Sequence, residues 1–230
     1  MAGKATGLGV VPSAARRRGW PDCYTKHSRS EVGPVVMFLR TLFCCVVVLL
    51  LGCGENQPPF KAKPVSNTPL AANFILTDQF GAPRSLTEFR GQVVSLFFGF
   101  THCPDICPTH LARQAEVMRQ LGPRADQLTV LFVTLDPERD SPAALKAYMD
   151  AFNPRFIALS GSPEETAKIA KQYKIFWQKT PLPGSALVYT IDHTTNSFLI
   201  DRQGHVRLIV PHELPATDVT HDISLLMGAP

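Results

Sequence analysis

The sequence predicts an α/β sandwich, in which a central mixed β-sheet is flanked by helices and an N-terminal signal or anchor segment comes first. Three observations lead to this fold class. Two continuous apolar runs of strand length, 93–100 and 128–135, indicate strands that are buried on both faces. A segment of helical character follows each of them, as is typical of a sheet that contains parallel strands. Towards the C-terminus, strand-like runs separated by turns add antiparallel pairs.

Residues 1–53 form a leader that ends in the pattern of an export signal. Arg40 stands before the apolar run 42–51, and the small residue Gly52 precedes Cys53. An uninterrupted run of about ten apolar residues is too short for a bilayer core, which needs roughly 20. The order Leu-Leu-Gly-Cys resembles a bacterial lipoprotein cleavage box, in which the cysteine is lipidated and becomes the mature N-terminus.

We therefore expect translation to start at Met37 and a lipid at Cys53 to anchor the protein on the periplasmic side of a bacterial cell envelope. Two alternatives stay open. An uncleaved membrane helix is possible if Val35–Met37 are counted and Arg40 snorkels. The apolar run could also be an ordinary buried stretch.

The chain beyond the leader divides into a tether and one domain. Residues 54–69 are polar and proline-bearing without periodicity, which indicates a flexible tether, and residues 70–230 form the domain. The leader holds seven Lys/Arg against two Asp/Glu, whereas the remainder holds sixteen against seventeen. A nearly neutral domain does not indicate a nucleic-acid partner.

The elements of the domain follow from its turn and breaker residues. A helix that starts at Pro108 is stopped by Gly122-Pro123, and a turn at 202–204 separates the last two strands. In chain order we expect strands at 74–77, 93–100 and 128–135, a helix at 142–152, a strand at 155–161, a helix at 163–173 with Ala167, Ile169 and Ala170 inward, a loop through Pro181, strands at 186–192, 197–201 and 206–210, and a helix at 215–227. This outline is thioredoxin-like.

The stretch THCPDICPTH (101–110) joins the buried strand to the first helix. If Pro108 is the first helical residue, its missing N–H costs no hydrogen bond, Cys107 becomes the cap and Cys103 lies in the preceding loop. A cysteine at a helix N-terminus is favoured as thiolate, which is both the nucleophile and the metal ligand. The helix would pack on the sheet through one stripe of residues, Leu111, Ala115, Met118 and Leu121.

The number of cysteines indicates that Cys103 and Cys107 have a chemical role and do not form a structural disulfide. Cleavage before Cys53 would remove Cys23, Cys44 and Cys45 and leave only Cys103 and Cys107 with free thiols. A domain of this length already has a core and needs no disulfide scaffold. Redox chemistry and metal binding both stay open.

A metal site would need a third ligand, and the sequence has seven histidines. His27 belongs to the leader, and three others are expected at the surface: His205, His212 and His221. His102 and His110 flank the cysteines, but the side chain of His102 should point away from Cys103. His193 stands between two strand-like runs, where a loop should return beside the cysteines. From these residues alone, a hydrogen-bonded histidine at a strand end is the simpler interpretation of His193.

Three blocks of sequence resemble the SCO/SenC family of copper-binding assembly factors for cytochrome c oxidase: FRGQVVSLFFGFTHCPDICPTHL (89–111), LFVTLDPERDSP (131–142) and VYTIDHTTNSFLIDRQG (188–204). The resemblance runs from about residue 70 to 227. It implies a thioredoxin fold in which Cys103, Cys107 and His193 bind one copper ion. Two soft thiolates and an imidazole also suit copper chemically, whereas structural zinc usually has four ligands.

The resemblance further implies that the protein is a metallochaperone and no turnover enzyme. Outside the cytoplasm it would deliver copper to the binuclear site of cytochrome c oxidase subunit II, with Cys103 and Cys107 as a redox pair. An upstream copper donor and a thiol reductant would be further partners. Asp136 and Asp140 match the family's DPERD block. For Asp140 we expect loop and helix capping, the role of Asp136 stays open, and Asp105 either tunes the thiolates or is solvated.

Other functions fit the same cysteines. The main alternative is a thiol–disulfide oxidoreductase that acts on the cysteines of the oxidase subunit, or a peroxiredoxin-like peroxidase. The usual oxidoreductase motif has two residues between its cysteines, and this chain has three. Cysteines four apart can still reach the Cα separation of about 5.5 Å that a disulfide needs. An inert structural disulfide is the third possibility.

Overall fold

The computed structural model of the protein describes residues 33, 60–65 and 73–228. Apart from residue 33, all of them belong to one compact unit, Gln57–Pro230. Within the described ranges, no helix is both long and apolar enough to cross a bilayer.

Two predictions about the leader, the start at Met37 and the lipid at Cys53, fall outside the described residues. The predicted tether is described in part. Ala62 within it is buried, and its backbone N–H donates to the carboxylate of Asp222 at 2.7 Å. The next residues, Lys63–Pro64, form strand β1. Residues 60–65 therefore pack on the domain, where the sequence had suggested a free tether.

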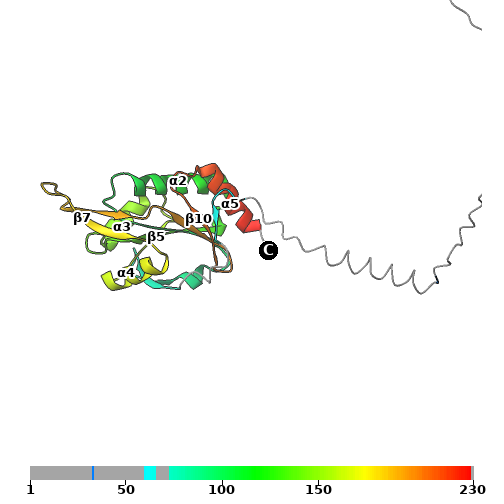
Figure 1. The fold of residues 1–230 in the computed structure, drawn as a ribbon, viewed down its shortest axis with the longest axis horizontal. Helices are drawn as coiled ribbons and strands as arrows, with labels where there is room; N and C mark the ends of the chain where they lie inside the picture. Colours follow the sequence, from blue (N-terminus) through cyan, green and yellow to red (C-terminus); the bar gives the residue numbers. More distant parts are fainter. Residues whose placement is uncertain (1–32, 34–59, 66–72, 229–230) are drawn as a thin grey trace, which may run out of the picture. The chain divides into compact units, whose positions relative to one another are not determined.

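The described elements confirm the predicted mixed α/β fold (Figure 1). The other strands are β2 (Ile75–Asp78), β3 (Pro83–Ser85), β4 (Val93–Gly99), β5 (Leu128–Thr134), β6 (Ile157–Ser160), β7 (Trp177–Pro181), β8 (Tyr189–His193), β9 (Ser197–Ile200) and β10 (Val206–Val210). The helices are α2 (Ile106–Leu121), α3 (Pro142–Asp150), α4 (Pro163–Gln172) and α5 (Ala216–Gly228), with 3-10 turns at Leu86–Phe89 and Gly122–Gln127.

Eight of the strands form one sheet in the order β1-β10-β9-β4-β5-β6-β2-β3. The neighbours β4, β5 and β6 are parallel, and all other pairs are antiparallel. Every residue of β4 is buried, as its continuous apolar run predicted. Gly99 at the end of β4 is in register with Thr134 at the end of β5. The loops that follow these two strands therefore leave the sheet at the same edge.

Two adjacent phenylalanines of β4 show how the helices cover the sheet. Neighbouring side chains of a strand point to opposite faces. Phe97 stacks on His110 of α2, whereas Phe98 contacts Tyr173 at the end of α4. Phe132 of β5 contacts Phe97 and also Tyr148 of α3. Helices α2 and α3 thus lie on one face and α4 on the other (Figure 1).

Two details differ from the prediction. Ile169 and Ala170 of α4 are buried as predicted, but the third buried residue is Thr166, and Ala167, which was expected to point inward, is exposed. The predicted loop is only partly correct: Pro183 and Gly184 lie in the connection between β7 and β8, but Pro181 ends β7 (Trp177–Pro181), which pairs antiparallel with β8 in a separate two-stranded sheet. The polar and proline-bearing sequence WQKTP has no alternating apolar pattern, so periodicity could not reveal a strand that is largely exposed on both faces.

Candidate metal centre

Helix α2 begins two residues earlier than the sequence predicted. Its N-cap is Asp105 and its first residue is Ile106, so Cys107 is a helical residue and not the cap. Pro108 occupies the third helical position, where an N–H group would have no intrahelical acceptor, so the proline loses no hydrogen bond there. Cys107 is fully buried, whereas Cys103 stays in the loop and is partly buried. The backbone N–H of Cys107 donates to the sulfur of Cys103 at 3.5 Å.

The end of β4 leaves room for the Cys107 sulfur because residue 99 is a glycine. A Cβ atom at Gly99 would lie 2.6 Å from the Sγ atom of Cys107. It would also lie 2.9 Å from the ring of Phe132 and 3.0 Å from the ring of Phe97. Interiors are packed too densely to absorb such overlaps without displacement. Core packing at the strand end therefore determines where the Cys107 sulfur sits.

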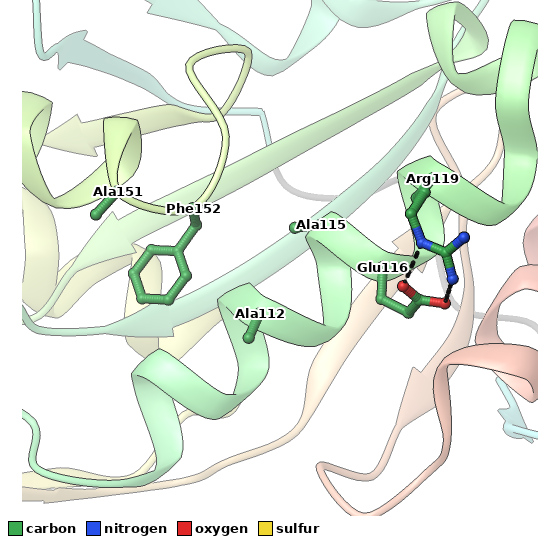
Figure 2. A pocket seen from close by; sticks show the side chains of 6 residues that line it. All are labelled: Ala112, Ala115, Glu116, Arg119, Ala151 and Phe152. Carbon is green, nitrogen blue, oxygen red and sulfur yellow. Dashed lines mark hydrogen bonds and ion pairs between the residues drawn. The ribbon is translucent and has the colours of Figure 1, made fainter.

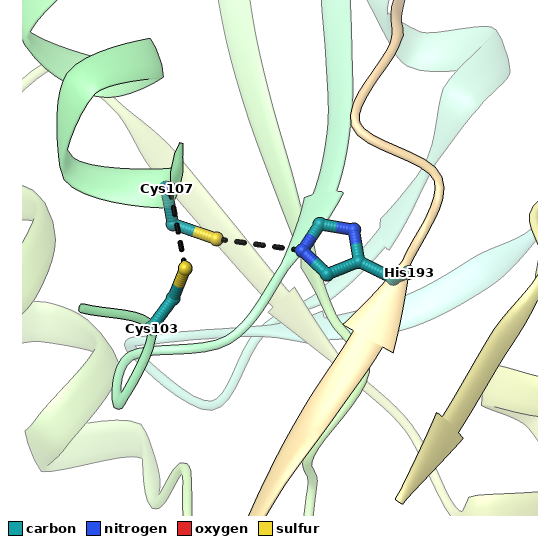
Figure 3. Close-up of side chains that lie close together, drawn as sticks. All are labelled: Cys103, Cys107 and His193. Carbon is teal, nitrogen blue, oxygen red and sulfur yellow. Dashed lines mark hydrogen bonds between the residues drawn. The ribbon is translucent and has the colours of Figure 1, made fainter. Parts of the chain in front are cut away.

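His193 reaches the cysteines from the last position of β8 (Figure 3). Its Nδ1 atom lies 2.8 Å from the carbonyl oxygen of Thr194. Since a carbonyl can only accept, Nδ1 carries a proton in this contact, which leaves Nε2 as the ring nitrogen available to a metal ion. Nε2 lies 3.8 Å from the Sγ atom of Cys107. A backbone hydrogen bond of Nδ1 thus orients the ring so that Nε2 of His193 faces the sulfurs.

The structure brings together the three residues that the sequence singled out. One potential ligand atom from each of Cys103, Cys107 and His193 lies within 4.8 Å of the others. Cys107 is buried and the other two are partly buried, so the group borders on solvent along one side. Two sulfurs and an imidazole nitrogen suit soft or borderline metal ions and not Mg²⁺ or Ca²⁺. Three donors also leave a coordination position open, unlike a closed structural zinc site.

The two thiols differ strongly in acidity. A hydrogen bond with the side chain of Cys107 is the largest cause that lowers the pKa of Cys103 to about 3; burial opposes it, and a hydrogen bond with His193 adds to it. The same contact, together with burial, raises the pKa of Cys107 far above its usual value. In the metal-free reduced pair, Cys103 is therefore the thiolate and Cys107 keeps its proton. The sequence had favoured a thiolate at Cys107, and burial of that sulfur overrides the helix N-terminus.

A second group of potential ligands follows the ends of β4 and β5. Donor atoms of His102, Asp136 and Asp140 lie within 4.8 Å of one another. The carboxylate of Asp140 is already engaged, because it accepts from the backbone N–H of Thr101 at 3.1 Å and from its hydroxyl at 2.6 Å. The hydroxyl of Thr134 donates to the same carboxylate at 2.6 Å. These contacts hold the loop before Cys103, so Asp140 has a structural role.

The expected helix cap at Asp140 is wrong. The N-cap of α3 is Ser141, whose hydroxyl accepts from the N–H of Ala144, the third helical residue, and Asp140 is no helix cap. Asp136 is also buried, and its carboxylate is paired with Arg139 and accepts from the hydroxyl of Tyr189 at 2.7 Å. Both carboxylates therefore connect separate segments of the chain, a role that their position in a polar loop did not reveal.

Most remaining histidines lie away from the sulfurs, as expected. His27 is outside the described residues. The other three are solvent-accessible and stand beside carboxylates: His205 by Asp201 at 3.4 Å, His212 by Glu213 at 2.9 Å and His221 by Asp222 at 3.1 Å. None of these three belongs to a group of potential metal ligands within the described part of the chain.

His110 is a buried residue whose role the sequence analysis missed. Its ring stacks on Phe97 with centroids 3.9 Å apart, and Arg113 Nη2 lies 2.9 Å from its Nδ1 atom. Burial and the nearby Arg113 charge lower the pKa of His110 well below its usual value, so the ring is neutral. Arg113 also donates to backbone carbonyls in the 211–214 loop. The spacing of three residues from Cys107 places His110 on the same helix face, a signal that could have predicted its burial.

A surface groove between α2 and the end of α3 offers no comparable chemistry (Figure 2). Its lining consists of Ala112, Ala115, Glu116, Arg119, Ala151 and Phe152. The two charged residues pair with each other at 2.6 Å. The groove contains neither a thiol nor an imidazole, and the Cys–Cys–His group remains the candidate centre.

The chain has clear relatives among known proteins. Residues 62–228 match the family model described as SCO1/SenC. "Protein SCO2 homolog, mitochondrial" from Bos taurus is 40% identical over 159 residues, which cover 68% of this chain and 59% of the bovine protein. The match therefore spans about three-fifths of that relative's length.

Solved structures show the same fold. ScoI from Bradyrhizobium japonicum, determined with copper bound, is 37% identical with a TM-score of 0.62, over 68% of this chain and 98% of that one. BsSco, described as a member of the Sco family of cytochrome c oxidase assembly proteins in which a disulfide switch was identified, is 21% identical with a TM-score of 0.58. That match covers 73% of this chain and 99% of BsSco, and at this identity it shows a shared fold alone.

Proposed function

The chain belongs to the SCO1/SenC family, and from this membership we propose that its domain binds one copper ion through Cys103, Cys107 and His193 and delivers it to the binuclear copper site of cytochrome c oxidase subunit II. Sco proteins are linked to copper binding and to cytochrome c oxidase assembly. The convergence of two thiols and an imidazole from two distant parts of the chain, with their donor atoms within 4.8 Å of one another, carries the proposal.

The donor set suits a cargo ion that must be released. Thiolate and imidazole ligands favour copper over hard cations, and a three-ligand group that borders on solvent leaves access for an acceptor. Cys107 keeps its thiol proton in the metal-free protein, so copper binding must release that proton. Copper affinity should therefore rise with pH over the range in which Cys107 is protonated.

A copper titration of the reduced protein tests the proposal. We expect one ion per wild-type domain, none in Cys103→Ser/Cys107→Ser, and much weaker binding in His193→Ala with both thiols intact. Oxidation of the pair before copper is added should abolish stoichiometric binding, since a disulfide has lost the thiolate charge. An oxidase-assembly assay in cells, run on the same variants, measures delivery. Normal copper binding by His193→Ala would refute the three-ligand site.

A thiol–disulfide oxidoreductase that acts on the cysteines of the same subunit is the second candidate. The observation that favours it is the asymmetry of the pair: both cysteines are free, and Cys103 is a partly exposed thiolate beside the buried, protonated Cys107. Such a pair can attack a disulfide with the outer sulfur and resolve it with the inner one. Under this function, His193→Ala would hold copper as wild type does and change only the rate of disulfide exchange.

We place the domain outside the cytoplasm, at the periplasmic side of a bacterial envelope, where it would meet a copper donor and a thiol reductant. The order of charge, apolar run, small residue and cysteine before residue 54 supports a lipid anchor at Cys53 in a chain that starts at Met37. Mass spectrometry of the native protein should find a lipidated N-terminal Cys53. An intact peptide across Gly52-Cys53 would exclude cleavage there, and Cys53→Ser should leave the folded domain unchanged.

A further inference from the structure

The strand that carries His193 is not part of the main sheet. Within the described residues, β7 and β8 pair only with each other, and His193 is in register with Trp177 at the base of this hairpin. Backbone hydrogen bonds of the eight-stranded sheet therefore do not hold His193 in place. The ring of His193 packs edge-on against Phe97 and Phe100, with ring centroids 6.1 and 6.0 Å apart, and further side-chain contacts hold the hairpin relative to the cysteines.

Many of these contacts come from one short turn, Asp136–Asp140, which follows β5. Arg139 Nη1 donates to the backbone carbonyls of Leu187 at 2.8 Å and Tyr189 at 2.9 Å. Its Nε pairs with the buried carboxylate of Asp136, and its guanidinium lies 3.7 Å from the ring centroid of Tyr189. The hydroxyl of Tyr189 donates to Asp136 at 2.7 Å. Arg139 and Asp136 together thus hold the start of β8 against the turn that follows β5.

The same turn holds the loop that carries Cys103. Asp140, at its far end, is fully buried and accepts from both the N–H and the hydroxyl of Thr101, two residues before Cys103. Within the turn, the N–H groups of Arg139 and Asp140 donate to the carbonyl of Asp136 at 3.1 and 2.9 Å. One hydrogen-bonded turn of five residues therefore contacts both parts of the candidate centre.

We propose that Arg139 is a positioning residue, which sets the distance between His193 and the two sulfurs by fixing the hairpin to the Asp136–Asp140 turn. The inference rests on the proposed function, because it matters only if His193 is a copper ligand. Arginine suits this position because its planar fork can donate to Asp136 and to two carbonyls at once while it stacks on an aromatic ring. A lysine carries the same charge but cannot make these contacts together.

The test compares copper affinities of reduced Arg139→Gln and Arg139→Lys with wild type, by competition against a chromophoric Cu(I) chelator. Loss of residues that orient metal ligands typically lowers affinity by about 10–100-fold, and we expect a loss in this range for both variants. The same substitutions in a His193→Ala background should cause no further loss, because the ligand that Arg139 positions is already absent. X-ray absorption of the copper-loaded Arg139 variants should show a weaker imidazole signal with the sulfur signal unchanged.

Three outcomes are distinguishable. If Arg139→Gln lowers affinity equally in both backgrounds, Arg139 acts on the domain as a whole and the inference is wrong. Unchanged copper affinity in Arg139→Gln, with His193→Ala still weakened, would also overturn it while the proposed function stands. If His193→Ala itself binds copper normally, the proposed function fails. Arg119→Gln is the matched control. Among the described residues the side chain of Arg119 pairs with its helix neighbour Glu116 at the surface, so this variant should bind copper as wild type does.

Discussion

The two cysteines and His193 rest on different kinds of structure. The cysteines follow β4, which lies between β9 and β5 inside an eight-stranded sheet and is buried at every residue. His193 ends a two-stranded hairpin whose residues are mostly exposed or half-buried. The geometry of a metal site depends on how firmly each ligand is held, and the least firmly held ligand limits it.

Displacing a cysteine and displacing His193 should therefore have different effects on copper affinity and on the free energy of unfolding. The Cys107 sulfur is held by core packing against Gly99 and its neighbours, so moving it should reduce both copper affinity and the free energy of unfolding. His193 is held by its bond to Thr194, by edge contacts with the rings of Phe97 and Phe100, and by the contacts of the hairpin, so moving the hairpin should reduce copper affinity more than the free energy of unfolding. Substitutions around the cysteines should therefore change stability and copper affinity together, whereas substitutions in the hairpin should change mainly copper affinity.

The largest effect should appear in thiol reactivity, because Cys107 is part of the core and Cys103 is not. With its pKa lowered to about 3, Cys103 stays a thiolate as pH falls from 8 to 5, so its alkylation rate in the reduced, metal-free protein should hardly change. A thiol of ordinary pKa would lose roughly tenfold in rate per pH unit below that pKa. Mass spectrometry after iodoacetamide treatment measures this.

Cys107, whose pKa is raised, should be labelled only after denaturant is added. Fast labelling of Cys107 in the folded protein would contradict this difference between the two sulfurs. A tenfold fall in the alkylation rate of Cys103 for each pH unit would contradict it as well. Cys103→Ser serves as the control that reports on Cys107 alone.

Hydrogen exchange should separate the hairpin from the sheet. Amides of β4 and β5 should exchange only when the whole domain unfolds, whereas those of β8 should exchange at least about 100-fold faster through local opening. The physical reason is that β8 has only β7 as its backbone partner among the described strands. Mass-spectrometric exchange of the reduced protein, with and without copper, measures the difference. Equal protection of β8 and β4 would mean that the hairpin and the sheet open as one unit.

The smallest predicted change concerns Gly99→Ala. The added methyl group would overlap the Cys107 sulfur and two core rings, so we expect a loss of about 1–3 kcal/mol in the free energy of unfolding, together with weaker copper binding. Denaturant titration and the chelator competition measure the two quantities in one sample.

Gly228→Ala is the control, because a Cβ at Gly228 meets no atom within 4 Å. A Gly99→Ala protein of full stability that binds copper normally would show that the sulfur is not held by the core.

Some of the local features of the sequence predicted the structure well. The apolar runs 93–100 and 128–135 became the buried neighbours β4 and β5, because only a strand inside a covered sheet can bury every side chain of such a run. The stop of α2 at Gly122 and the turn at Gly204 were also predicted, since both glycines adopt a positive φ that other residues avoid. The spacing of Cys103 and Cys107 indicated a shared site.

The sequence alone thus predicted the order of the helices and the central strands, and the burial of β4 and β5. It also singled out Cys103 and Cys107, and through the family resemblance His193. Only the tertiary structure decided that Cys103 is the thiolate and that a turn after β5 holds both parts of the centre. The reason is physical: strand and helix formation follows from neighbours in the chain, whereas burial, pKa and the approach of His193 depend on residues as much as 86 positions apart.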